Sequence, residues 1–255
     1  MIDNLKKFQV IEKIFRDVLN ANNFTEIRTT TIQPLNLYTS AGTLTPSMLH
    51  GTYSFLDWDG WSGERIVLRP DVTVPVAQWY LNNIQGEEAK LFYIEPVYRF
   101  VDDKNNREIW QCGTELINIS PEIANEEIIK LVTELLGKLH LTTAIKVVIT
   151  NKDDGLHADS YDALPNGSIA KRLIEALSNI FETTGFNYEF IDSSANKKFE
   201  YYTNYAFSVI TNDTEILSGG RYDNLCEELG GKKTYASGFA FNMNEIIKLL
   251  ADDRQ

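Results

Sequence analysis

The sequence predicts an α+β fold in which helices flank a mostly antiparallel sheet, and three patterns carry this prediction. Residues 3–22 and 120–140 place apolar side chains three and four positions apart, which is typical of amphipathic helices. Residues 91–118 form two apolar runs joined by the polar stretch 101–107, which is typical of a β-hairpin. Short runs rich in β-branched residues around these segments predict further strands.

The composition is that of an ordinary globular protein. A chain of 255 residues, 43% of them hydrophobic, has enough apolar side chains for a sizeable core, and it shows no repeat or linker, so we expect one domain over residues 1–255. The net charge of −12 repels nucleic-acid phosphates. The sequence shows neither a membrane-spanning apolar run nor a signal peptide. We therefore expect a cytoplasmic protein that binds neither nucleic acid nor membrane.

The cysteines and histidines do not predict a metal or redox site. Cys112 and Cys226 have no paired spacing, so we expect two buried, reduced thiols rather than a disulfide framework or a zinc site. The three histidines, His50, His140 and His157, are scattered along the chain. No cofactor is implied by these residues.

Between the first helix and the central hairpin, the sequence predicts short strands and loops. Residues 25–32 are rich in β-branched side chains and predict a strand, and the polar stretch 39–50 predicts a loop. Residues 53–57 and 64–69 predict two strands joined by a turn at 59–63.

The stretch 68–73 predicts a switch from strand to helix. Pro70 ends the strand, and either Asp71 or Thr73 can cap the helix that follows. A simple helix cap is one interpretation of Asp71, and a ligand contact is the other.

The central hairpin places polar side chains on the faces of its two strands. Because side chains alternate across a strand, two sets of residues each share one face: Glu95, Val97 and Arg99 on the first strand, and Gln111, Gly113 and Glu115 on the second. One interpretation is a solvated sheet face, which antiparallel sheets often have. The other is a site for a small zwitterionic ligand, because buried charged groups are costly without partners.

The remainder of the chain is predicted to alternate helices and strands. The expected elements are a strand at 144–150, a helix at 168–184 closed by Gly185, a strand at 186–191, a hairpin of 203–210 and 215–217 turning at 212–213, a glycine-rich stretch at 218–223 and a helix at 242–250. Glycines at 218–223 let the backbone approach another group closely.

Four groups of residues occur in the same order as in histidyl-tRNA synthetases. They are 68–73, 107–115, 201–203, and 219–223 together with 238–240. The chain resembles the class II synthetase catalytic domain over nearly its whole length. It is especially similar to the non-aminoacylating relatives in that family, the regulatory subunits of ATP phosphoribosyltransferase. The resemblance implies the class II antiparallel sheet flanked by helices.

The resemblance also implies a histidine-binding site. Asp71 and Thr73 match the residues that receive the α-amino group, with Asp71 standing where the synthetases usually have glutamate. Gln111 matches a second group near the amine, and Arg99 matches the arginine that faces the amino-acid carboxylate.

The imidazole end of that site is implied by three further matches. Glu115 and Tyr201 match the pair that holds the ring, and Tyr202 lines the pocket. Charge-assisted hydrogen bonds in a partly dry pocket are strong, so these residue types suit a cationic ligand.

Three positions depart from the synthetase pattern at the ATP site. Lys197 stands for the catalytic arginine, Glu245 for the arginine that grips the γ-phosphate, and Val101 for the glutamate that reads adenine. Lysine lacks the two-pronged geometry of arginine, and a carboxylate repels phosphate. Adenylation is therefore not expected. No anticodon-binding domain is expected either, because the sequence stops at Gln255, directly after the last helix of the resemblance.

We interpret the chain as a non-catalytic regulatory subunit that binds L-histidine for feedback control and activates a short-form ATP phosphoribosyltransferase catalytic subunit. Residues 4–33 match the class II dimerisation element, so we expect a homodimer within a hetero-oligomer. The alternatives are a reduced synthetase-like enzyme that activates an amino acid with ATP, and a stand-alone amino-acid-binding or dimerisation module.

Overall fold

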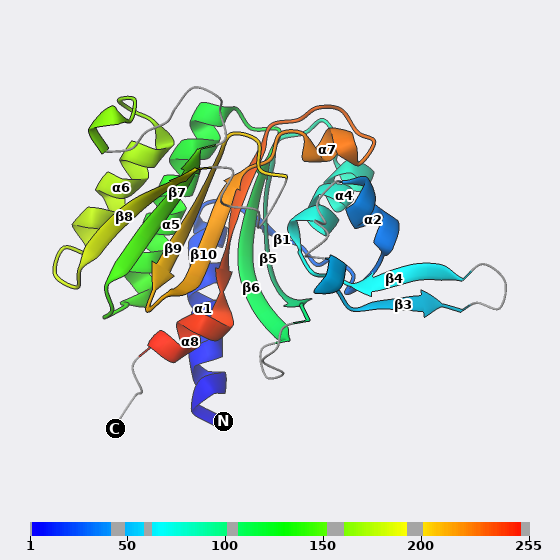
Figure 1. Ribbon diagram of the computed structural model, residues 1–255, viewed down its shortest axis with the longest axis horizontal. Coiled ribbons are helices and arrows are strands. Elements are labelled where there is room, and N and C mark those ends of the chain that lie inside the picture. Colours follow the sequence, from blue (N-terminus) through cyan, green and yellow to red (C-terminus); the bar gives the residue numbers. More distant parts are fainter. Residues whose placement is uncertain are drawn as a thin grey trace.

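The computed structural model describes residues 2–41, 49–58, 63–100, 107–151, 161–192 and 201–250. An eight-stranded sheet has the strand order β1-β5-β6-β11-β10-β9-β7-β8, and a three-stranded sheet has the order β2-β4-β3 (Figure 1). The elements are α1 (Ile2–Ala21), β1 (Thr25–Glu26), β2 (Ile32–Pro34), α2 (Leu35–Ser40), β3 (Ser54–Asp57), β4 (Glu64–Leu68), α4 (Thr73–Asn83), β5 (Ala89–Tyr98), β6 (Glu108–Ile117), α5 (Pro121–Leu139), β7 (Ile145–Asn151), the 3-10 helix η2 (Tyr161–Ala163), α6 (Ile169–Ile180), β8 (Phe186–Asp192), β9 (Tyr205–Thr211), β10 (Thr214–Arg221), α7 (Leu225–Glu228), β11 (Ala236–Asn242) and α8 (Met243–Leu249).

The α+β prediction is confirmed, including the mostly antiparallel pairing. In the large sheet β1–β5 and β7–β8 pair in parallel, and the other neighbouring strands pair antiparallel. The predicted central hairpin is β5–β6, and it pairs Leu91 with Glu115, Tyr93 with Gly113 and Glu95 with Gln111. Directly paired residues lie on the same face of a sheet, so this register decides which side chains meet.

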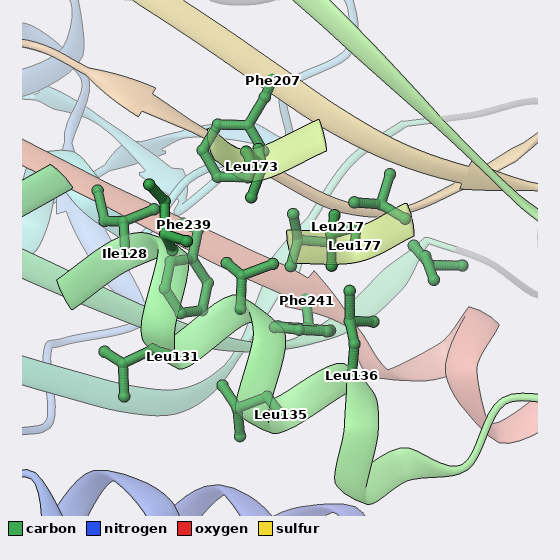
Figure 2. Close-up of a cluster of buried hydrophobic side chains, with 14 of the residues drawn as sticks. Ile128, Leu131, Leu135, Leu136, Leu173, Leu177, Phe207, Leu217, Phe239 and Phe241 are labelled. Carbon is green, nitrogen blue, oxygen red and sulfur yellow. The ribbon is translucent and has the colours of Figure 1, made fainter. Parts of the chain in front are cut away.

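One face of the large sheet is covered by α1, α5 and α6 (Figure 1). Figure 2 shows the apolar side chains of α5 and α6 directed toward those of the strands, and the labelled residues are Ile128, Leu131, Leu135, Leu136, Leu173, Leu177, Phe207, Leu217, Phe239 and Phe241. Pro121 at the first position of α5 and left-handed His140 at its end fix the limits of that helix. This side of the sheet is the apolar core.

The opposite side of β5 and β6 carries a second buried cluster, to which α2, α4 and α7 contribute (Figure 1). Val76 and Tyr80 of α4 pack there with Tyr38 of α2 and Leu225 of α7. This cluster contains buried tyrosines as well as aliphatic side chains, and the candidate site lies on the same side.

Several predicted limits are confirmed by local chemistry. Asn212 and Asp213 both have positive φ, 48° and 58°, which suits the tight turn between β9 and β10. Asn242 caps α8, because its side chain accepts a hydrogen bond from the Glu245 backbone N–H at 3.3 Å. Cys112 and Cys226 are free and buried, as predicted.

The single strand predicted at 25–32 is wrong. The segment divides into β1 in the large sheet and β2 in the small sheet. Between them, the Thr29 backbone N–H donates to Glu95 Oε1 at 2.8 Å, and its carbonyl accepts from Arg69 Nη1 at 2.9 Å. Buried side chains thus satisfy the backbone groups that a neighbouring strand would otherwise pair.

Other limits differ from the predictions. Thr39 and Ser40, placed in a loop, belong to α2, and α6 ends at Ile180 rather than at residue 184. The glycine-rich stretch continues β10 to Arg221, and β11 was not predicted, although it lies between β6 and β10. Gly238 locally favours a loop. The segment around it is a central strand because β6 and β10 pair with it on either side.

Some predicted features lie outside the described residues. They are most of the loop at 39–50, most of the turn at 59–63 and most of the polar stretch at 101–107. None of the helices in the described ranges combines the length and apolar character needed to cross a bilayer.

Candidate functional site

A pocket with about 340 Å³ of space, part of it open to solvent, lies on the α4 side of the large sheet. Its lining residues come from α4, from β5, β6, β10 and β11, from residues next to these elements, and from the segment before β9: Asp71, Thr73, Tyr93, Arg99, Gln111, Glu115, Tyr201, Tyr202, Ser218, Tyr222, Gly238, Phe239 and Ala240. All seven residues predicted for the ligand site are among them. That these residues bind histidine stays a prediction.

The hollow in the sheet follows from the register of β6, β11 and β10. One row across these strands is Gly113, Ala240 and Ser218, and the next is Glu115, Gly238 and Gly220. Five of these six residues are small, and directly paired residues share a face. The sheet surface is therefore low at this point, and Glu115 stands beside the depression.

Two glycines are required by their neighbours rather than by backbone conformation. A Cβ on Gly238 would overlap the Glu115 carboxylate, and a Cβ on Gly113 would overlap the ring of Tyr93. The ring of Tyr93 thus lies over Gly113 at the floor of the pocket. Real Cβ atoms do not approach other atoms so closely, so alanine at either position must displace a pocket side chain.

Asp71 lies at the start of α4 and serves two purposes. Its Oδ1 accepts a hydrogen bond from the Val74 backbone N–H at 2.9 Å, and its Oδ2 accepts from Tyr201 at 3.3 Å. Its exposed fraction is 6%, and burial raises the pKa of this carboxyl, although the hydrogen bonds and Arg99 act in the opposite direction. Asp71 therefore binds a backbone N–H in the first turn of α4, whose N-cap residue is Val72, and also lines the pocket.

Glu115 is the most deeply buried acid of the pocket, with an exposed fraction of 1%. The Thr73 hydroxyl donates to its Oε1 at 2.9 Å, and the Tyr222 hydroxyl donates to its Oε2. Burial raises the pKa of Glu115 to about 8, against lowering by the two hydroxyls, and the charge of Asp71 adds to the increase. This face of the sheet is thus buried and polar, and the interpretation as a solvated face is wrong.

Arg99 supplies the positive charge among the described residues that line the pocket. Its Nε donates to the carbonyl of Pro70 at 2.9 Å, which ties the end of β5 to the residue before Asp71. Its charge lowers the pKa of Asp71, so the two groups interact. Gln111 adds an amide to the same wall.

Three tyrosines form the aromatic side of the pocket. Tyr201 and Tyr202 have ring centroids 4.9 Å apart, and Tyr201 and Tyr222 make an edge-to-face pair at 5.8 Å. Burial raises the pKa of all three phenols well above the ordinary value, so each keeps its proton at neutral pH. The hydroxyl of Tyr201 also hydrogen-bonds Thr73.

Glu95 does not line the pocket, although it shares a sheet face with Gln111. Its carboxylate pairs with Arg69 at 2.8 Å, and the exposed fractions of the two side chains are 4% and 2%. Arg69 also donates to the carbonyl of Pro96 at 2.7 Å. An internal cation thus satisfies Glu95, which was not among the residues predicted for the ligand site.

The positions that depart from the synthetase pattern have different outcomes. Lys197 and Val101 lie outside the described residues. Glu245 lies in the first turn of α8, where both carboxylate oxygens accept from Lys248 Nζ at 2.8 Å, and it is not among the pocket residues.

Sequence reasoning gave no role to six lining residues: Tyr93, Ser218, Tyr222, Gly238, Phe239 and Ala240. A signal for Tyr93 existed, because it lies two residues before Glu95 and so shares its face. Tyr222 and residues 238–240 belong to the motifs shared with histidyl-tRNA synthetases. Their contacts with Glu115 could not be predicted, because these residues lie far from Glu115 along the chain.

Comparison with known proteins agrees with this fold. A family model described as histidyl-tRNA synthetase matches residues 3–154 and 155–246. A solved structure described as an ATP phosphoribosyltransferase regulatory subunit/histidyl-tRNA synthetase from Bacillus halodurans superposes with a TM-score of 0.74, at 19% identity, over 97% of this chain and 80% of that one. The protein therefore has the fold of class II, histidyl-tRNA synthetase-like proteins.

Relatives at the sequence level narrow this class. The histidine–tRNA ligase of Pyrococcus abyssi is 28% identical, over 96% of this chain and 72% of the relative. The ATP phosphoribosyltransferase regulatory subunit of Dehalococcoides mccartyi is 34% identical, over 97% of this chain and 74% of the relative. The chain belongs to the histidyl-tRNA synthetase family and, within it, to the ATP phosphoribosyltransferase regulatory subunits.

Proposed function

We propose that this chain binds L-histidine in the pocket and transmits its presence to a short-form ATP phosphoribosyltransferase catalytic subunit. The observation that carries this proposal is the convergence of Asp71, Glu115 and Arg99 on one small pocket. Two acids and one guanidinium complement a ligand with two basic groups and one carboxylate. Among the common amino acids, histidine combines these groups with a flat ring that suits tyrosine walls.

The placement of the ligand follows from the charges. Asp71 faces the α-ammonium, with Thr73 and Gln111 beside it, and Arg99 faces the carboxylate. Glu115 then receives the imidazole. The tyrosines contact the ring and exclude water, which strengthens every charged hydrogen bond in the pocket.

The chain itself is proposed to be non-catalytic. Glu245 stands where the synthetases hold the γ-phosphate with arginine, and its partner in the structure is Lys248. Adenylyl transfer needs cationic groups to stabilise developing negative charge, and a carboxylate opposes this. The test is pyrophosphate exchange into ATP in the presence of histidine, which we expect to be absent. Robust exchange that Arg99→Ala abolishes would instead establish the synthetase-like enzyme.

Histidine binding is tested directly by calorimetry and thermal shift. L-histidine is expected to raise Tm, since a ligand at a hundredfold excess over Kd stabilises the folded state by about 2.7 kcal/mol. Asp71→Asn and Glu115→Gln should each weaken binding. Glu189→Gln, on the exposed surface of β8, is the matched control and should bind normally. Folded protein that shows neither heat nor thermal shift with millimolar histidine would refute the proposal.

Feedback control requires histidine to distinguish two states of the complex. A ligand with equal affinity for both states shifts nothing, and a coupling of about 1 to 3 kcal/mol is typical of allosteric control. We propose that the chain forms a homodimer that assembles with the catalytic subunit. Co-purification tests the assembly, and Glu115→Ala should weaken inhibition by histidine while Glu189→Ala preserves it. Inhibition that survives Glu115→Ala would place the sensing site elsewhere.

A further inference from the structure

Among the residues that the structure describes, no cation acts on Glu115 as one does on the other buried acid on this face. Glu95 is paired with Arg69. The hydrogen bonds to Glu115 come from two hydroxyls, those of Thr73 and Tyr222, and its charged neighbour is another acid, Asp71. An isolated carboxylate in such a place is strongly disfavoured, whereas a neutral carboxyl is not.

Phenols and a second acid face Glu115 from the elements packed against it. Among the described residues, the titratable or charged ones are Asp71, Tyr93, Tyr201, Tyr202 and Tyr222, with Arg99 acting on Asp71. The phenols stay neutral at physiological pH because burial raises their pKa. The charge balance around Glu115 therefore depends on Asp71 and on what the ligand brings.

We propose that Glu115 carries a proton before the ligand binds and transfers it to the side-chain ring of the ligand, so that the site selects amino acids with a basic ring. This inference rests on the proposed function. In the step, the O–H bond of Glu115 breaks and an N–H bond forms on the ring nitrogen. The carboxyl becomes a carboxylate and the ring becomes a cation, so the total charge is unchanged and no proton from solvent is needed.

The geometry is prepared for the charged product. The two hydroxyls hold Oε1 and Oε2 separately, and hydrogen bonds to a carboxylate are stronger than those to a neutral carboxyl. Tyr222 is thus a positioning residue, since it acts on the ligand through Glu115. The pKa of about 8 for Glu115 agrees with a carboxyl that holds its proton at neutral pH. Release of the proton on binding is driven by the ion pair with the ring and by the two hydroxyl donors, which stabilise the carboxylate.

The protonation state of the bound ring can be measured directly. At pH 7.5 free histidine has a mostly neutral ring, because the imidazole pKa is about 6.5, whereas Glu115 still holds most of its proton. Nitrogen NMR of ring-labelled L-histidine bound at this pH is expected to show two protonated ring nitrogens. One protonated and one unprotonated nitrogen would overturn the inference. Absence of any binding would instead refute the proposed function, so the two failures are distinguishable.

Ligand analogues and a matched pair of variants test the same step. An alanine that carries a 1,2,4-triazole has nearly the shape of histidine but a much weaker base, and it is expected to bind about tenfold or more weakly at pH 7, because it forms a neutral rather than a charged hydrogen bond. Tyr222→Phe removes a donor to the Glu115 carboxylate, so it should weaken the binding of histidine several-fold more than it weakens the binding of the triazole analogue. Tyr80→Phe removes a buried hydroxyl that donates to the Glu87 carbonyl, away from the pocket, and should affect both ligands equally. Equal losses for both ligands in Tyr222→Phe would contradict the inference.

Discussion

Replacement of Glu115 by glutamine should make the free protein more stable, and the gain should grow with pH. The structure gives the reason, since Glu115 is 1% exposed and none of the described residues that act on it is a cation. Its pKa is raised by burial from 4.5 to about 8. Between these values the unfolded chain has lost the proton while the folded chain keeps it, so stability falls as pH rises.

The magnitude follows from the linkage. Each pH unit in this window contributes about 1.4 kcal/mol, so wild-type protein should lose about 3 kcal/mol relative to Glu115→Gln between pH 5 and pH 7.5. The contribution is fully present below pH 4.5 and is lost by about pH 8. Any effect of glutamine on packing is the same at every pH and therefore cancels in the difference between the two pH values.

Urea unfolding of both proteins, without histidine, measures this difference. The two unfolding free energies should diverge steadily from pH 5 to pH 7.5, with the variant more stable at the upper end. Glu189→Gln, an exposed acid on β8, should follow wild type at each pH. Parallel curves for wild type and Glu115→Gln would show that Glu115 ionises normally, and the reasoning about its burial would be wrong.

Three further predictions concern packing, ion pairing and assembly. Gly113→Ala should lower the free energy of unfolding by about 1 to 3 kcal/mol and abolish histidine binding, because the Cβ displaces the ring of Tyr93. Its control is Gly137→Ala in α5, where the Cβ enters open space. In urea unfolding this variant should be as stable as wild type or up to about 1 kcal/mol more stable. Arg69→Met should lower the free energy of unfolding by about 3 to 5 kcal/mol, because Glu95 is left buried without its cation. Arg172→Met removes a surface pair and should lower it by at most about 1 kcal/mol in the same assay. Similar losses for the two variants would contradict this argument. Light scattering at micromolar concentration should give twice the chain mass of 29.1 kDa, and a single chain mass would refute the homodimer.

Local sequence determined the elements whose limits depend on neighbours along the chain. Pro121 and His140 delimit α5, and Asn212 with Asp213 forms the turn of the β9–β10 hairpin, because each acts through its own backbone conformation. The central hairpin was likewise predicted, since its two strands alternate and its loop is polar. Such features need no information from distant residues.

The division of residues 25–34 between two sheets was decided by tertiary structure. The β-branched residues favour one strand. The backbone of Thr29 is instead bound by two distant side chains, those of Arg69 and of Glu95, and Glu95 lies more than sixty residues away along the chain. The same applies to β11, where Gly238 reads as a loop locally and becomes a central strand because β6 and β10 pair with it. Long-range pairing overrides local preference in both cases.

The candidate site shows the same division. The sequence, through the resemblance of its motifs, predicted seven residues for the site, and all seven line the pocket, whereas six other lining residues were not predicted. Only the tertiary structure decided how they meet: Tyr222 lies 107 positions from Glu115, and Tyr201 lies 130 positions from Asp71. The pKa of Glu115 arises from the burial and hydroxyl donors that these contacts create. The environment of a carboxyl group exists only once the chain has folded around it, and here that environment raises the pKa of Glu115 to about 8.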